Sequence, residues 1–158
     1  MARKKYGIIA DDFMTIIEKI DKFGGDVKKT AKDMLDVAPK IINPKLHAAM
    51  QEHRRTGRTE KGIIENPQIE DNGTVLAIPV GFDIKKDGKT NLASIFLMYG
   101  TARHAPANQY GKYSGEVKGV EQDKKLYDAI YGNATKKEIK AAQEKILGEA
   151  LQAAMKGK

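Results

Sequence analysis

The sequence contains no cysteine among its 158 residues. This absence excludes disulfide frameworks, thiolate nucleophiles and cysteine-ligated zinc. No apolar run approaches the ~20 residues that a membrane-spanning helix needs. The first residues, Met1-Ala-Arg-Lys-Lys-Tyr, lack the apolar stretch and the cleavage site of a signal peptide. We therefore expect a protein that is made and folded in a cytosol and that has no membrane partner.

The signature motifs of common enzymes are also missing. The sequence has no GxGxxG and no GxxxxGK[ST] motif, so neither common type of nucleotide site is indicated. His47 and His53 are six residues apart, which places them about 120° from sharing a helix face and makes a joint metal site unexpected. His104 has no carboxylate near it in sequence, since none occurs between residues 90 and 115. We expect no catalytic residues, no metal and no cofactor.

The chain does carry an excess of positive charge. Its 28 Lys and Arg outnumber 21 Asp and Glu, for a formal net charge of +7, which favours contact with phosphate or with an acidic partner. The densest basic run is Arg54-Arg-Thr-Gly-Arg58. Candidate contacts to DNA or to an acidic neighbouring subunit are Arg54, Arg55, Arg58 and Lys61. The alternative is a solvated helix end, where cations offset the negative pole of the helix.

Helical spacing of apolar residues opens the chain. It predicts one helix over residues 10–23 and a second that begins near Asp26. We expect the second helix to end before Pro39, because a proline disfavours helical geometry in the residue before it. Asn43-Pro44 then predicts a third helix, with Asn43 as the N-cap and Pro44 in the first turn.

The periodicity changes after residue 57. Residues 63–70 and 74–82 are short segments rich in β-branched residues, joined by the turn sequence Asp71-Asn-Gly73. Asparagine and glycine tolerate positive φ, so this pattern predicts a β-hairpin. Pro67 and Pro79 each lack a ladder donor, which places them at edges, bulges or strand ends.

Two more helical regions follow the hairpin. Apolar spacing predicts a short helix over residues 91–100, with Gly100 as its left-handed C-terminal cap. A helix around residues 123–131 comes next, and Thr135-Lys-Lys-Glu138 fits a capping box at the start of the final helix. Residues 101–121, between these regions, show no steady period and predict a long loop of the kind that tends to be functional or flexible.

These elements predict a single α+β domain over residues 1–158, with N-terminal helices and a C-terminal helix packed on a small antiparallel sheet based on a β-hairpin. The predicted parts are a basic arm (1–9), a helical part (10–56), the hairpin (61–86), a short helix (91–100), the long loop (101–121) and C-terminal helices (122–156).

Tyrosines gather in the last part of the chain, where five of the six occur from Tyr99 onward. Tyrosine and arginine are enriched where proteins bury surface against partners. An interface with another subunit is therefore one interpretation, and ordinary anchoring of core and loop is the other. The candidate interface residues are Tyr99, Gly100, Thr101, Arg103, His104, Tyr110 and Tyr113.

The assembled pattern resembles the small neck proteins of long-tailed phages (siphophages), the gp-ten-like tail-component group, over roughly residues 30–156. In that group an R-T-G segment precedes a hairpin, as Arg55-Thr-Gly57 does here. A Gly-Thr pair with nearby prolines precedes the last helix, as Gly100-Thr101 and Pro106 do here. Tyr99 stands where the group usually has a glutamate, and residues 105–131 are longer than the corresponding link.

The resemblance implies a non-catalytic virion protein of the head-to-tail interface, made in the host cytoplasm. Such a tail-completion or neck protein forms a homo-oligomeric ring, expected to be a hexamer. Its neighbours would be the head connector or stopper protein and the tail terminator or tail tube protein, with DNA passing through the channel. A closed ring needs two different surfaces on each subunit, and we expect the hairpin and the segment after Gly100 to supply them.

The alternative function is that of a small basic DNA-binding protein. It would use Arg3-Lys-Lys5 and the basic run over residues 54–61. This alternative predicts binding to free duplex DNA with a steep salt dependence, whereas a neck ring only has to tolerate DNA in its channel.

Overall fold

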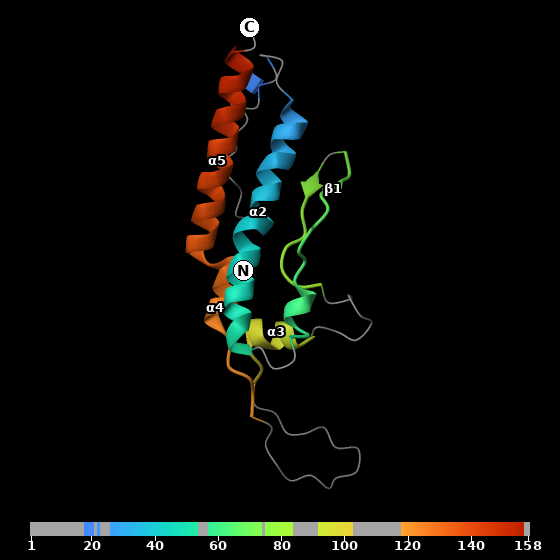
Figure 1. Ribbon diagram of the computed structural model, residues 1–158, viewed down its shortest axis with the longest axis vertical. Helices are drawn as coiled ribbons and strands as arrows, with labels where there is room; N and C mark the ends of the chain where they lie inside the picture. Colours follow the sequence, from blue (N-terminus) through green and yellow to red (C-terminus); the bar gives the residue numbers. More distant parts are fainter. Residues whose placement is uncertain are drawn as a thin grey trace, which may run out of the picture.

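The computed structural model describes residues 18–20, 22, 26–53, 57–73, 75–83, 92–102 and 118–156. The chain is an α+β protein, as predicted from the sequence. Two long helices, α2 (Val27–Met50) and α5 (Asn133–Lys156), lie side by side, and the hairpin lies on the other side of α2 (Figure 1). The shorter helices α3 (Leu92–Tyr99) and α4 (Lys124–Tyr131) lie at one end of this pair. The predicted basic arm, and most of the helix predicted over residues 10–23, lie outside the described residues.

Helix α2 begins where the sequence predicts. Asp26 is its N-cap, and the side chain of Asp26 accepts a hydrogen bond of 2.8 Å from the backbone N–H of Lys29. The predicted end before Pro39 is wrong, because α2 continues through both Pro39 and Pro44 as one helix. Asn43 is therefore no N-cap and instead lies buried inside α2.

The packing of α2 explains why it continues past its prolines. A proline inside a helix costs about 3 kcal/mol, through a lost hydrogen bond and a clash with the preceding turn. Ile42, Leu46 and Met50 are almost completely buried on one face of α2, and each buried side chain of this size contributes about 1.5–3 kcal/mol. Burial along this face offsets the cost of the prolines, a gain that local sequence signals do not contain.

The β-hairpin is confirmed, although its regular strands are shorter than predicted. Strands β1 (Glu70–Asp71) and β2 (Leu76–Ala77) pair antiparallel next to the turn. The far ends of the two arms meet at an isolated bridge between Ile63 and Phe82. The two proline positions fall between these paired ends, where regular pairing is interrupted. A one-turn 3-10 helix, η2 (Glu60–Gly62), precedes the first arm, and another, η1 (Gln51–His53), follows α2.

The start of α5 differs from the predicted capping box. The helix begins at Asn133, so Thr135 lies within its first turn and is 2% exposed. The hydroxyl of Thr135 donates to the carbonyl of Asp128 at 3.0 Å and accepts from Lys45 Nζ at 3.1 Å. Glu138 does not reach back to the helix start, because its carboxylate pairs with the same lysine at 2.6 Å. The two residues thus connect α5 to α4 and α2.

One apolar core joins α2, the first hairpin arm, α3 and α4. Its buried members are Ile42, Leu46, Ala49, Met50, Ile63, Met98, Leu126 and Ala129. Val80 and Phe82 of the second arm pack against this cluster, as does Ile139 of α5. The core therefore fixes α3 and α4 against the rest of the molecule, at the place where the predicted interface residues begin.

Candidate functional site

The C-terminal end of α3 is built around Gly100. Its φ of +69° is in the left-handed region, and its backbone N–H donates to the carbonyl of Phe96 at 2.8 Å, which confirms the predicted cap. A Cβ at this position would lie 2.9 Å from the carbonyl oxygen of Val120. Gly100 is thus required both by its backbone conformation and by the close approach of the returning chain.

The two ends of the predicted loop are held together at this point. The backbone N–H of Thr101 donates to the carbonyl of Val120 at 2.8 Å, and the backbone N–H of Val120 donates to the Thr101 hydroxyl at 2.9 Å. The returning segment also binds two carbonyl groups at the end of α3. The backbone N–H of Asp123 donates to the carbonyl of Leu97 at 2.8 Å, and the side-chain amide of Gln122 donates to the carbonyl of Met98 at 3.0 Å. We call residues 100–101 and 120–123 the loop base.

Exposed apolar side chains gather around the loop base. Tyr99 stacks edge-on against Tyr127, with ring centroids 6.0 Å apart, and Tyr127 contacts Tyr131 at 5.0 Å. The hydroxyl of Tyr99 donates to that of Tyr131 at 3.3 Å, and this contact raises the pKa of Tyr99. The most exposed apolar side chains of α3, α4 and the loop base are Phe96 (44%), Tyr99 (54%), Val120 (42%) and Tyr131 (41%). We call these four residues the aromatic face.

The predicted interface residues fall into two groups. Tyr99, Gly100 and Thr101 lie together at the end of α3 and at the loop base. The others, Arg103, His104, Tyr110 and Tyr113, lie outside the described residues. Sequence reasoning counted Tyr131 among the gathered tyrosines without choosing it as an interface residue. It missed Phe96 and Val120, although the spacing of Phe96 and Tyr99 by three residues places them on one side of a helix.

The basic run is described only in its second half. Arg58 and Lys61 are exposed, with Arg58 in the turn before η2 and Lys61 within it. Both residues make interactions within the chain. Arg54 and Arg55 lie outside the described residues, so the run stays a prediction as a contact surface.

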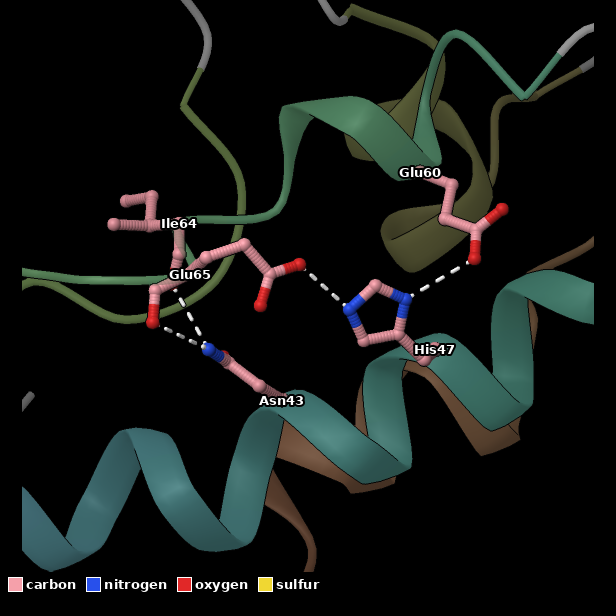
Figure 2. Close-up of polar contacts among 5 residues, drawn as sticks. All are labelled: Asn43, His47, Glu60, Ile64 and Glu65. Carbon is pink, nitrogen blue, oxygen red and sulfur yellow. Dashed lines mark hydrogen bonds and ion pairs between the residues drawn. The ribbon is translucent and has the colours of Figure 1, made fainter.

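A polar cluster that sequence reasoning missed surrounds His47 on α2 (Figure 2). Its Nδ1 lies 3.1 Å from Oε1 of Glu60, and its Nε2 lies 2.7 Å from Oε1 of Glu65. One turn earlier, the side-chain amide of Asn43 donates to the carbonyl of Ile64 at 3.0 Å. These contacts attach η2 and the first hairpin arm to α2. The partners of His47 are 13 and 18 residues away in sequence, so no local pattern could have revealed them.

The electrostatics of this cluster favour the charged form of His47. The hydrogen bond with Glu60, opposed by burial and helped by Glu65, raises the pKa of His47 above its ordinary value of 6.5. Glu65 makes the shorter contact but has the smaller effect, because its side chain is 52% exposed and that of Glu60 only 17%. Water screens the more exposed carboxylate more strongly.

Another polar cluster, around Asp123, fixes the start of α4. Asp123 is the N-cap of α4, with one carboxylate oxygen accepting from the N–H of Leu126 at 3.1 Å and the other binding Nε2 of His53. Burial by itself raises the pKa of Asp123, but the His53 contact and backbone N–H groups lower it on balance. Beside this pair, Lys125 binds Glu52. The cluster joins η1 to α4 and so supports the loop base.

None of the clusters described above has its side chains arranged as a metal site. Across the described ranges, no group of three or more His, Asp or Glu side chains is placed to hold a metal ion. The part of the chain that the structure describes also contains no helix long and apolar enough to cross a membrane. The arrangement at the loop base offers contact surface, namely aromatic rings and hydroxyl groups on a fixed backbone.

Comparison with known proteins gives no relative to set beside this geometry: no protein-family model, no curated protein and no solved structure matches the chain.

Proposed function

We propose that this protein is a non-catalytic structural subunit of the head-to-tail joint of a long-tailed phage. In this role it completes the tail or neck as a ring, expected to be six-fold, between the head connector or stopper and the tail terminator or tube. The observation that carries the proposal is the aromatic face, in which four apolar side chains that are 41–54% exposed surround the loop base. Exposed apolar side chains that gather at one end of a molecule are typical of interaction sites.

The backbone beneath the aromatic face supports a role in binding. Rigid aromatic side chains lose little conformational entropy when they are buried against a partner. Tyr99 and Tyr131 are already restrained by Tyr127 and by their mutual hydrogen bond. The hydrogen bonds of the loop base hold Val120 beside Gly100 and Thr101. A partner would therefore meet a surface that is largely preorganised.

A ring also requires a second, different surface on the same subunit. The turn of the hairpin is a candidate, because it presents Val75 with 61% of its surface exposed. The hairpin turn and the α3–α4 end lie toward opposite ends of the molecule (Figure 1). Two candidate contact surfaces that lie far apart fit a head-to-tail contact between subunits, in which one surface meets the other.

The proposal is tested by deleting the coding sequence from the phage that carries it. We expect lysates with unattached heads and complete tails in electron micrographs, and rescue when the wild-type chain is supplied in trans. The double variant Tyr99→Ser/Tyr131→Ser should reduce the number of joined particles at least about tenfold, since aromatic anchors dominate interface energy. Intact, infectious virions made without the protein would overturn the proposal.

A matched control is available on α5. Met155 lies in the last turn and is 57% exposed, similar to Tyr99 at 54%. Met155→Ser matches the single variant Tyr99→Ser in the exposed fraction of the residue it replaces and lies at a distant place, so it should rescue as well as the wild type does. If the control variant fails equally, the loss in the double variant reflects general damage, and the aromatic face is not the contact.

The competing class, a small basic DNA-binding protein, is supported by the net charge of +7 and by the exposed Arg58 and Lys61. A gel shift on duplex DNA across a salt series separates the two functions. Tight binding whose logarithm falls steeply with the logarithm of salt concentration would favour the DNA-binding protein. A neck subunit should show at most weak binding that disappears near physiological salt.

A further inference from the structure

The imidazole of His47 is held between two carboxylates, one at each ring nitrogen (Figure 2). The distances are 3.1 Å to Glu60 and 2.7 Å to Glu65, both within the range of hydrogen bonds. An ionised carboxylate can only accept a hydrogen bond. Both contacts are therefore hydrogen bonds only when both ring nitrogens carry a proton, that is, when His47 is positively charged.

A neutral imidazole cannot satisfy this geometry. It has one N–H and one lone pair, so one carboxylate would face the lone pair of the ring at hydrogen-bond distance. The loss of a single proton thus converts one attractive contact into a repulsive one and leaves two negative charges beside the ring. This change from attraction to repulsion arises at a single side chain, that of His47.

Two carboxylates contact the His47 ring. Glu60 faces His47 from η2, and Glu65 faces it from the first hairpin arm. On the side of α2, the positions one turn before and after His47 hold Asn43, Pro44, Met50 and Gln51. None of these four side chains ionises, so on α2 no titrating group lies one turn from His47.

The other links between α2 and the first hairpin arm do not depend on pH. Ile63 is fully buried in the core, and the Asn43 amide binds the carbonyls of Ile64 and Glu65 at 3.0 Å and 3.4 Å. The first arm is in turn bonded to the second, since the N–H of Ile64 donates to the carbonyl of Gly81 at 2.9 Å. A change at Glu65 would therefore be transmitted to the hairpin while the core stays closed.

We propose that His47 is a proton-operated latch: in its charged form it holds the carboxylates of Glu60 and Glu65 against α2, and in its neutral form it keeps Glu60 and releases the Glu65 side chain, which loosens the first hairpin arm without detaching it. Glu65 is the contact that is lost because its side chain is 52% exposed and gains hydration on release, whereas Glu60 is 17% exposed. The position of the hairpin relative to α2 then depends on pH. This inference does not depend on the proposed phage function.

The direction of the pH dependence follows from the raised pKa of His47. A group whose pKa is higher in the folded state stabilises that state fully below its ordinary value, here 6.5, and loses this contribution as the pH rises through the raised pKa. The latch is therefore closed in mildly acidic solution and opens on the alkaline side of 6.5.

The test is an NMR titration of the full-length chain from about pH 5 to about pH 9. We expect the His47 ring to titrate above 6.5 and the amide shifts of residues 63–65 and 81–83 to follow the same midpoint. Once the intrinsic pH effect is removed, exchange of the Ile64 amide should quicken about threefold to tenfold above that midpoint, which corresponds to the loss of one hydrogen bond.

Variants make the test specific. Glu60→Gln and Glu65→Gln should each lower the His47 midpoint, because each removes one negative charge beside the ring. In His47→Gln the pH-dependent amide shifts of the hairpin should vanish, while the chain stays folded through Ile63 and Asn43. Glu70→Gln, an exposed glutamate of β1, should change none of these properties. A His47 midpoint at or below 6.5, or hairpin amides that ignore the His47 titration, would overturn the proposal.

Discussion

Thr101 and Val120 are joined by two hydrogen bonds, of 2.8 Å and 2.9 Å, although 18 residues lie between them in sequence. The pairing uses the backbone N–H of both residues and closes the loop base next to Gly100. The exposed side chains of the aromatic face thus lie next to a backbone that is already held by hydrogen bonds. A contact surface of this kind does not have to form its own scaffold when a partner arrives.

Gly100→Ala should destabilise the protein more than Gly57→Ala does. Both glycines have a φ of +69°, so both variants share the cost of a left-handed residue with a side chain, about 1–2 kcal/mol. A Cβ at Gly100 would also lie 2.9 Å from the Val120 oxygen, whereas nothing lies within 4 Å at Gly57. Urea unfolding of both variants measures the difference. Equal losses would show that the chain approach at the loop base is not restrictive.

Gly132→Ala and Gly148→Ala should change stability in opposite directions. A Cβ at Gly132, between α4 and α5, would lie 2.5 Å from the Asp128 carbonyl oxygen, so the junction must shift at a cost of about 1–3 kcal/mol. Gly148 lies inside α5 with nothing within 4 Å, so alanine there should stabilise by about 1 kcal/mol. Thermal or urea unfolding provides both values, and a shared sign would contradict the junction geometry.

Thr135→Val should cost about 1–3 kcal/mol, the range for buried polar groups that lose a partner. The variant removes the hydroxyl that donates to the Asp128 carbonyl and accepts from Lys45. Thr135→Ser keeps that hydroxyl and should be close to the wild type. If both variants were equally stable, the hydroxyl would have no role in connecting α5 to α4 and α2.

The variants Asp123→Ala and Asp123→Asn distinguish two contributions of Asp123 to stability, the N-cap of α4 and the negative charge beside His53. Alanine removes the N-cap of α4 and should cost about 1 kcal/mol, in addition to the lost contact with His53. Asparagine is a good N-cap, so it should retain most of this stability at neutral pH. The two variants are compared with the wild type by urea unfolding across a pH series.

The change in stability at acidic pH can be predicted in direction. Because the folded chain lowers the pKa of Asp123, its stabilising effect is present above its ordinary value of 3.8 and is lost as the pH falls through the lowered pKa. The wild type should therefore lose more stability on acidification than Asp123→Asn does. Identical acid limbs would mean that the His53 contact adds nothing to stability.

Elements with local causes could be predicted from the sequence. Asp26 caps α2, Gly100 ends α3, and the turn after Asp71 closes the hairpin, as expected. Each of these signals acts within about four residues, the range over which side chains compete for backbone hydrogen bonds. The α+β class follows from the sum of such local signals.

Features with distant causes could not be predicted. Lys45 binds both Thr135 and Glu138, which are 90 and 93 residues away in sequence. The two residues of the apparent capping box therefore contact α2 and do not cap α5. His47 looks like an ordinary polar residue in sequence, because its two carboxylates come from segments that only the fold brings to α2. The candidate site could be predicted only in part for the same reason. Tyr99 and Gly100 lie at a helix end that the local sequence indicates, whereas Tyr131 contacts Tyr99 only through tertiary packing.

The two prolines of α2 also affect how the chain can acquire its structure. An isolated peptide spanning residues 26–53 should be a poor helix, because the prolines interrupt its hydrogen bonding and short helices are marginal in water. Support comes late along the chain, for instance where the Gln143 amide binds the carbonyl of Met34 at 3.1 Å across 109 residues. During synthesis, the amino-terminal half would leave the ribosome with its longest helix unfinished and would depend on the arrival of α5 to complete it.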